Sequence, residues 1–339
     1  MIKIYTDDLI SRLQNNGGIS TVWRLLKQNT IFTIEWDSNE KVYLFGLPFS
    51  IGYLPDALER FLDVSSPPNT IFHSTYLRLG RGKGVVNIVT VHDCIYERYS
   101  KGFRLCLHKL QMRRVLRKSN LIVSVSESTK RDIVYFYPFV HSNKIKVIHN
   151  GYDNESFFVE ENQSASKSIL YVGTRNDHKG FSDFLKVLSQ LPDTFKAEVI
   201  GRPFSKGERK EIPKNLLSRI EVHSNVSIDE LRKRYNESLV FIYPSLFEGF
   251  GIPVIEAMAC GCPVICRSNS SLTEVGGRAA LFTGDDFVKD AIQFILRLTE
   301  NSAFRRQVVN LGLTNAQRFE SQIMADKYLE LYKRVDKVK

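Results

Sequence analysis

Residues 239–258 read LVFIYPSLFEGFGIPVIEAM, an apolar run followed by a glycine-rich turn and a second apolar run. The first run has the length of a buried strand, and Pro253 suits the first turn of a helix. Glycines between a strand and a helix let the backbone approach a ligand, and the amides at the helix start attract anions. The stretch therefore predicts a strand, a turn with a diphosphate site, and a helix of a doubly wound α/β domain. The glycines alone fit a plain structural turn equally well.

Short apolar runs of this kind recur along the chain and alternate with helical stretches. They lie at residues 2–5, 42–45, 71–74, 85–91, 121–125 and 145–148, and then at 169–172, 197–201, 220–223, 239–243 and 263–266. Continuous apolar strands that alternate with helices are typical of parallel sheets covered on both faces. We therefore expect two Rossmann-like domains with doubly wound parallel sheets, at residues 1–155 and 156–320, that face a central cleft. A helix at residues 321–339 is expected to pack back on the first domain.

The positive charge of the chain is concentrated in its first half. The 339 residues carry a net charge of +10, and the first 150 hold 21 Lys and Arg against 12 Asp and Glu. Residues 101–118 combine basic and apolar side chains, as amphipathic helices on anionic bilayers do. The hypothesis is peripheral contact with an anionic membrane surface, and an ordinary surface helix is the alternative.

No apolar run approaches the length of a membrane-spanning helix, and the N-terminal residues lack the pattern of a signal peptide. A cytoplasmic location is expected. The five cysteines suit a reducing compartment, and Cys260, Cys262 and Cys266 lack the spacing of a zinc site, so buried small side chains are expected there. No Asp-x-Asp motif stands near the predicted turn, and neither a metal nor a cofactor is expected.

Two glutamates mark the predicted turn and helix. Glu248 lies in the turn, and Glu256 follows eight residues later, where its carboxylate can accept hydrogen bonds from ribose hydroxyls. Residues 245–265, SLFEGFGIPVIEAMACGCPVI, resemble the donor-site signature of the family 4 retaining glycosyltransferases, which have the GT-B fold. The resemblance implies that Glu248 is catalytic near the donor sugar and that Glu256 binds the ribose. It also implies donor contacts from Gly249, Phe250, Gly251 and Ile252.

A second candidate site follows the strand predicted at residues 169–172. Cations at the end of a strand can stabilise a leaving diphosphate, and Arg175 and Lys179 are the candidates, although a solvated charged loop is the alternative. Residues 173–180, GTRNDHKG, resemble the family's Gly-x-x-x-x-Arg-Lys-Gly motif, in which Gly173 and Lys179 match and His178 replaces the arginine. We expect Arg175 to supply the missing charge because arginine is ionised at every physiological pH. A protonated His178 is the other option.

The first domain holds two further motifs. Residues 14–20, QNNGGIS, resemble a loop of bacterial polysaccharide and lipopolysaccharide glycosyltransferases that lies by the phosphates and the acceptor, which assigns Gly17 and Gly18 to the donor site. A tight turn is the commoner explanation of two adjacent glycines. The histidine after a strand in related enzymes approaches the transferred sugar, so His92 is expected to be catalytic. Asp93 and Glu97 are placed with it on the acceptor side.

The resemblance as a whole implies a hexosyltransferase that retains anomeric configuration. It would move mannose, GlcNAc, glucose or galactose from a GDP- or UDP-linked donor to a glycan acceptor, expected to be lipid-linked, in the synthesis of O-antigen, lipopolysaccharide or capsule. A nucleotide-sugar epimerase of the same fold is the alternative enzyme. A basic nucleic-acid-binding protein is more remote because no motif for nucleic acid is present. A dinucleotide oxidoreductase is disfavoured because no Gly-x-Gly-x-x-Gly follows the first strand.

Overall fold

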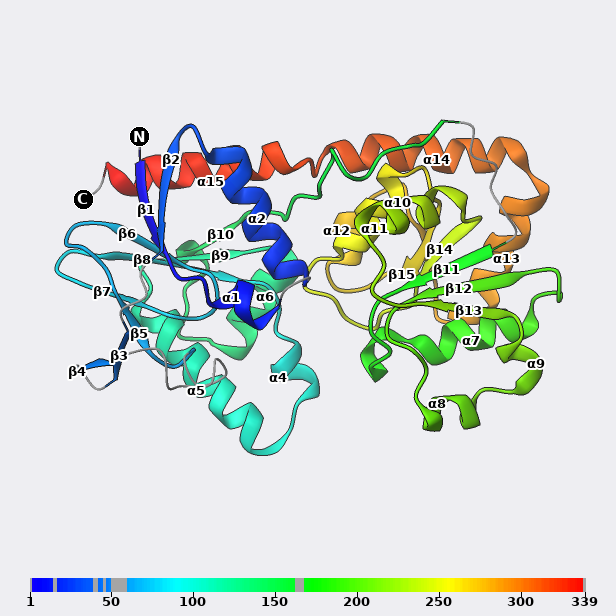
Figure 1. Cartoon of the computed structure of the whole chain (residues 1–339), viewed down its shortest axis with the longest axis horizontal. Helices are drawn as coiled ribbons and strands as arrows, with labels where there is room; N and C mark the ends of the chain where they lie inside the picture. The colour runs from blue at the N-terminus through cyan, green and yellow to red at the C-terminus, as the bar shows by residue number, and fades with distance from the viewer. Residues whose placement is uncertain are drawn as a thin grey trace. The chain divides into compact units, whose positions relative to one another are not determined.

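The computed structural model describes residues 2–14, 17–38, 42–44, 47–49, 60–161 and 168–337. For those of them that lie within residues 38–59, it describes the backbone and not the side chains. The chain forms two compact units. The first comprises residues 1–151 with 321–339, and the second comprises residues 152–320, so the first boundary falls at Gly151 and not at residue 155. Each unit is built around a six-stranded sheet (Figure 1). The predicted fold class, two doubly wound α/β domains, is confirmed.

The main sheet of the first unit is parallel throughout and has the strand order β10-β9-β8-β6-β1-β2. The strand order reverses between β1 and β6, where ligand sites form in such sheets. The apolar runs that predicted the inner strands are buried, as expected for a sheet covered on both faces. Its strands are β1 (Ile2–Thr6), β2 (Ile34–Ser38), β6 (Ile71–Ser74), β8 (Val86–Val91), β9 (Leu121–Ser124) and β10 (Ile145–Val147).

The helices of this unit include the C-terminal one, which packs against α2, β1 and β6. Tyr332 of that helix lies 2.6 Å from Nδ1 of His73 on β6, and both side chains are buried. The C-terminal helix is thereby part of the first unit. The helices are α1 (Leu9–Leu13), α2 (Gly18–Thr30), α4 (Ile95–Tyr99), α5 (Gly102–Lys118), α6 (Glu127–Phe136), η2 (Ser142–Lys144) and α15 (Ser321–Asp336).

One predicted strand belongs elsewhere. Residues 42–44 form β3 in a separate small sheet with the order β4-β3-β5-β7, and β2 takes the edge of the main sheet. In β2 buried Ile34 is followed by exposed Glu35, so an edge strand with mixed polarity escaped a search for continuous apolar runs. The small sheet consists of β3 (Val42–Leu44), β4 (Leu47–Phe49), β5 (Asp63–Ser65) and β7 (Gly80–Arg81).

The sheet of the second unit is also parallel and has the order β13-β12-β11-β14-β15-β16. This is the Rossmann order, in which the first strand lies in the middle and the strand order reverses beside it, between β11 and β14. Its strands are β11 (Ser168–Val172), β12 (Lys196–Ile200), β13 (Ile220–His223), β14 (Val240–Tyr243), β15 (Val264–Arg267) and β16 (Leu281–Thr283).

Helices cover both faces of this second sheet (Figure 1). Val240 and Ile242 of β14 join a buried cluster with side chains of α7 and α13, whereas Phe241 between them packs against Tyr235 of α10. Alternate residues of one strand therefore meet helices on opposite faces. The helices are η3 (Asp177–Lys179), α7 (Phe181–Gln190), α8 (Lys206–Glu211), α9 (Lys214–Leu217), α10 (Ile228–Glu237), α11 (Ile252–Ala259), α12 (Leu272–Gly276), α13 (Phe287–Glu300) and α14 (Ser302–Gln317).

Candidate functional site

The two motifs of the second unit leave the sheet from neighbouring strands. Residues 173–180 follow β11 and residues 244–251 follow β14, and these two strands pair where the strand order reverses. The loops are joined directly, because the amide of Leu246 donates a 2.7 Å hydrogen bond to the carbonyl oxygen of His178. Ligands of open α/β sheets bind at this position, beyond the carboxyl ends of the strands. The fold thus brings the two sequence motifs to one site.

An ion pair lies at the junction of the two loops. Nζ of Lys179 lies 2.6 Å from Oε1 of Glu248, and the same oxygen accepts a hydrogen bond of 2.6 Å from the Ser245 hydroxyl. The side chains of Lys179 and Glu248 are 19% and 9% exposed. A pair so shielded from solvent interacts more strongly than a surface pair, since water screens it less. The geometry therefore joins two of the predicted catalytic residues.

Glycines set the backbone of both loops. Gly180 has φ 65°, and a Cβ there would clash with the carbonyl oxygen of Pro244, so the close approach of the two loops requires glycine. Gly251 has φ 105° and precedes the first residue of α11. The Ser271 hydroxyl lies 2.9 Å from the carbonyl oxygen of Glu248 and 2.8 Å from that of Phe250, which fixes the turn before the helix.

Glu256 lies on α11, one turn beyond its start. Its Oε2 is 3.5 Å from the hydroxyl of Tyr235, which is fully buried in α10. Burial raises the pKa of Glu256 to about 7, the Tyr235 hydroxyl lowers it, and the negative charge of Asp153 adds to the rise. Glu256 therefore exchanges a proton with solvent near neutral pH. As a carboxylate it can accept the hydrogen bonds of two vicinal hydroxyls.

The structure contradicts the assignment of Arg175 to the diphosphate. The Arg175 side chain is 1% exposed, and its Nε lies 2.8 Å from Oε1 of Glu208. Its two terminal nitrogens donate to the carbonyl oxygens of Arg202 at 2.7 Å and Pro203 at 3.1 Å. The guanidinium therefore holds the loop after β12 to the start of α8. The Arg175 contact also lowers the pKa of the Glu208 carboxyl to about 2.

His178 does not replace the missing arginine either. Burial lowers the pKa of His178 from its ordinary 6.5, and the charge of neighbouring Lys179 lowers it further. Its imidazole is therefore mostly neutral at pH 7. Lys179 is the cation that this motif brings to the loop junction. Arg202, which follows β12 next to β11, has a side chain 67% exposed and lies 3.7 Å from Oε1 of Glu208.

In the first unit, His92 directly follows β8. Its Nε2 is buried and has no hydrogen-bond partner among the described residues. Burial lowers the pKa of His92 to about 4, so the imidazole is neutral. A buried polar atom without a partner is uncommon in proteins and often marks a functional position. Neighbouring Asp93 accepts a 2.9 Å hydrogen bond from the amide of Ile95 and thereby supports the start of α4.

Glu97 has a different environment from the one predicted. Its side chain is 0% exposed, lies 3.1 Å from Nε2 of His108 and accepts a 2.5 Å hydrogen bond from the Tyr137 hydroxyl. The carboxylate therefore links α4 to α5 and α6, and it offers no exposed surface to an acceptor. Sequence spacing from His92 does not tell which side of a short helix faces the interior, which explains the error.

The glycine pair of the first unit begins a helix. The amide of Gly17 donates to the Ser20 hydroxyl at 3.1 Å, and that hydroxyl lies 2.8 Å from the Gly17 carbonyl oxygen. Gly18 is the first residue of α2. Asn15 and Asn16 of this motif lie outside the described residues. The role of Gly17 and Gly18 at a donor stays a prediction.

Cys260, Cys262 and Cys266 are buried, as expected for small side chains that lack the spacing of a zinc site. Over the described ranges, no group of three or more His, Cys, Asp or Glu side chains is arranged to hold a metal ion. Within the same ranges, no helix is long and apolar enough to cross a bilayer.

Comparison with known proteins finds two matching family models. The model of the family described as Glycosyltransferase Family 4 matches residues 40–156, and that of Glycosyl transferases group 1 matches residues 153–312. O-antigen chain mannosyltransferase B of Escherichia coli is 29% identical over 171 residues, which are 48% of this chain and 45% of that protein. O-antigen chain mannosyltransferase RfbU of Salmonella typhimurium is 29% identical over 70% of this chain and 69% of its own length.

A third relative, from Xanthomonas oryzae, is described as GDP-mannose:cellobiosyl-diphosphopolyprenol alpha-mannosyltransferase. It is 23% identical over 85% of this chain and 81% of its own length. Among solved structures, sucrose-phosphate synthase from Thermosynechococcus elongatus has the same fold, with a TM-score of 0.77, 16% identity and full coverage of both chains. With its two motifs joined at the strand reversal of a Rossmann-like sheet and both family models matching, the chain belongs to the glycosyltransferases of family 4 and group 1, with the GT-B fold.

Proposed function

We propose that the chain is a retaining hexosyltransferase that uses a GDP- or UDP-linked sugar and extends a bacterial surface polysaccharide. The observation that carries the proposal is the contact of Lys179 with Glu248 at the strand reversal. In a donor complex, Lys179 would stabilise the charge that develops on the departing diphosphate, as preorganised cations do. Glu248 would hold Lys179 in place and meet the donor sugar. The names of the mannosyltransferase relatives favour mannose among the hexoses.

The remaining predicted site residues are proposed to contact the donor. The start of α11 at Ile252 would face the diphosphate, and Glu256 would accept hydrogen bonds from the ribose. The neutral His92 imidazole would hydrogen-bond a sugar hydroxyl, because its Nε2 needs a partner. The diphosphate itself would take the acceptor's proton on the face from which it leaves, which preserves anomeric configuration. We propose that neither a metal ion nor a cofactor takes part, and that Lys179 supplies the positive charge at the diphosphate.

The acceptor is proposed to be a lipid-linked glycan at the cytoplasmic face of a membrane. The Xanthomonas relative is named for a diphosphopolyprenol acceptor. In this chain, α5 exposes Phe103 and Leu110, at 77% and 66%, beside exposed Arg104 and Arg113. Apolar side chains flanked by cations suit the interface of an anionic bilayer. We therefore propose that α5 contacts that membrane surface peripherally.

The test of the donor site is nucleotide binding by the whole chain. UDP, GDP and a panel of their hexose conjugates are screened by thermal shift, and the dissociation constants of those that stabilise the chain are measured by calorimetry. Glu256→Ala should weaken binding by about 1.5 to 3 kcal/mol, the value of hydrogen bonds to a charged partner. Glu300→Ala, an exposed change at the end of α13, serves as the matched control and should bind as wild type. Equal binding by both folded variants and wild type would refute the proposed donor site.

The reaction product distinguishes the proposed transferase from the alternative, a nucleotide-sugar epimerase. With the stabilising donor and a lipid-linked glycan acceptor, NMR should show a new glycosidic bond of the same anomeric configuration as the donor. An epimerase would instead release a free or isomerised sugar and no transferred product. Isomerised donor without any transfer to acceptor would replace the present proposal with that alternative.

A further inference from the structure

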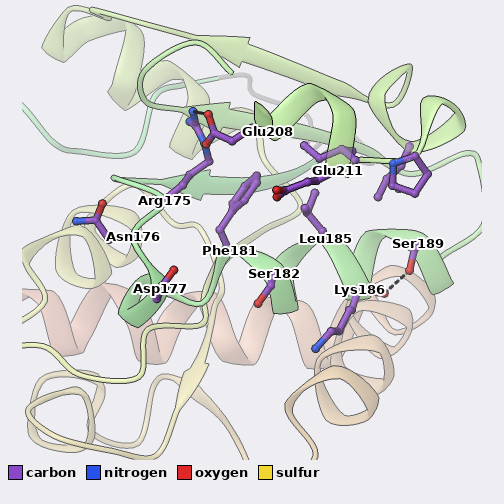
Figure 2. Close-up of a pocket in the computed structure, with 13 residues that line it drawn as sticks. Arg175, Asn176, Asp177, Phe181, Ser182, Leu185, Lys186, Ser189, Glu208 and Glu211 are labelled. Atoms are coloured by element: carbon purple, nitrogen blue, oxygen red, sulfur yellow. Dashed lines mark hydrogen bonds and ion pairs between the residues drawn. The ribbon is translucent and has the colours of Figure 1, made fainter. Parts of the chain in front are cut away.

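A groove of about 480 Å³ lies on the second unit between α7 and the segment that forms α8 and α9 (Figure 2). Its floor is apolar, with Phe181 and Leu185 from α7 and Ile212 and Leu216 from the opposite wall. The volume falls in the range of small-molecule sites, which combine an apolar lining with a few placed polar groups. None of the motif residues given a donor role above, apart from the corrected Arg175, lines this groove.

Polar groups surround the apolar floor. Asp177 and Ser182 lie at the end near the donor loops, which are residues 173–180 and 244–251. Ser189 lies further along α7. Figure 2 shows the Glu211 side chain pointing from α8 toward Phe181 and Leu185. Carboxylates accept hydrogen bonds, and hydroxyls both donate and accept them. A sugar ring matches this arrangement, because its C–H faces are apolar and its hydroxyls point outward around the edge.

The charges of the groove disfavour an anionic ligand. The two basic side chains of its lining are already paired, Arg175 with Glu208 at 2.8 Å and Lys186 with Asp183 at 3.0 Å. Within the described parts of the chain, neither Asp177 nor Glu211 forms an ion pair. These two carboxylates repel phosphates and other anions. The groove therefore differs in chemistry from the diphosphate site, and neutral hydroxyl-rich molecules suit it.

The groove adjoins the donor loops. Asp177 begins the short helix η3, which ends at Lys179, and Phe181 follows Gly180 at the start of α7. A ligand in the groove thus contacts the same segment that positions Lys179 against Glu248. Resting on the proposed function, we propose that the groove is a second glycan-binding subsite, which holds a neutral hexose unit of the growing polysaccharide beside the donor loops.

Two variants test the subsite in the full chain. Ser182→Trp places an indole in the groove from an exposed position of α7, and Glu211→Gln removes a carboxylate while keeping its shape. Mannotriose, maltotriose and chitotriose are the probes, and saturating UDP or GDP occupies the donor site. Saturation-transfer NMR should show binding of at least one trisaccharide to wild type. Ser182→Trp should abolish that binding, and Glu211→Gln should weaken it about tenfold, as expected for loss of a charged acceptor.

Controls keep this inference separate from the donor site. Glu300→Gln, a matched loss of carboxylate outside the groove lining, should bind the trisaccharide as wild type does. If no trisaccharide binds wild type, or if both groove variants bind it as tightly as wild type does, the subsite is overturned. The proposed function survives that outcome as long as UDP or GDP binds and Glu256→Ala weakens the binding. Absence of nucleotide binding would instead remove the proposed function itself.

Discussion

Lys179 and Glu248 come from loops that follow neighbouring strands, and their charged atoms lie 2.6 Å apart. The pair fixes the position of Lys179 at the junction of the two loops. Lys179→Ala should therefore lower kcat about 100-fold or more, because it removes a preorganised charge that acts on the transition state, while the donor dissociation constant changes less. Transfer rates at saturating donor, compared with calorimetric binding of the nucleotide, check this. Lys289→Ala, a change of an exposed lysine on α13 outside the groove lining, is the control and should keep wild-type kcat. Equal losses of kcat and donor affinity in Lys179→Ala would contradict a transition-state role.

Glu256 makes stability and donor binding depend on pH. Its pKa is about 7 in the folded chain and near 4.5 when unfolded, so the stability it contributes is present below pH 4.5 and is lost as pH rises through 7. Glu256→Gln should consequently gain stability relative to wild type between pH 5 and pH 8, by up to about 3 kcal/mol. Denaturant unfolding at several pH values measures the difference. A difference that does not change with pH would show that Glu256 titrates normally.

The same titration predicts the pH dependence of nucleotide binding. If the ribose needs the carboxylate form of Glu256, donor affinity should rise through pH 7 and binding should release protons at pH 6 to 7. Calorimetry in two buffers of different ionisation enthalpy counts those protons. The Glu256→Gln variant should release none through this group.

Arg175 differs from Lys179 in that its positive charge has a structural role. Its guanidinium contacts Glu208 and the carbonyl oxygens of Arg202 and Pro203. Arg175→Gln should therefore lower the free energy of unfolding by about 1 to 3 kcal/mol, since the hydrogen bonds to Glu208, Arg202 and Pro203 lose their donor. In the fraction that stays folded, kcat at saturating donor should fall only a few-fold. A loss of kcat as large as that of Lys179→Ala would restore Arg175 to the diphosphate site.

The sequence and the structure differ most where a residue's role depends on its partners. The apolar runs predicted the inner strands because burial on both faces leaves a continuous signal, and the glycine turn predicted the start of α11. The polarity of Glu35 in β2 concealed an edge strand of the main sheet. Charge at physiological pH made Arg175 the better candidate, yet its acceptors lie 27 to 33 residues away and no local pattern reveals them.

Membrane contact through α5 is tested by flotation with liposomes. Phe103 and Leu110 are exposed on α5, so replacing both with serine should not disturb the core. The wild-type chain should float with anionic liposomes at physiological salt, and the double variant should lose most of that binding because apolar insertion is removed. Phe32→Ser, which changes a side chain 93% exposed after α2, is the matched control and should float as wild type. Failure of the wild type to float would count against the membrane proposal.

His92 is expected to act as a neutral hydrogen-bonding group. Burial holds the pKa of its imidazole near 4, so its charge does not change between pH 6 and pH 8. His92→Ala should lower kcat about 100-fold with little effect on nucleotide binding, because the lost contact would be made to the reacting sugar and not to the nucleotide. His92→Gln, which restores a neutral donor and acceptor, should recover part of the rate. Transfer rates from pH 6 to pH 8 should fall by the same factor throughout in both variants. If the defect of His92→Ala disappeared at one end of this range, the wild-type imidazole would have to titrate within it, and the neutral role would be wrong.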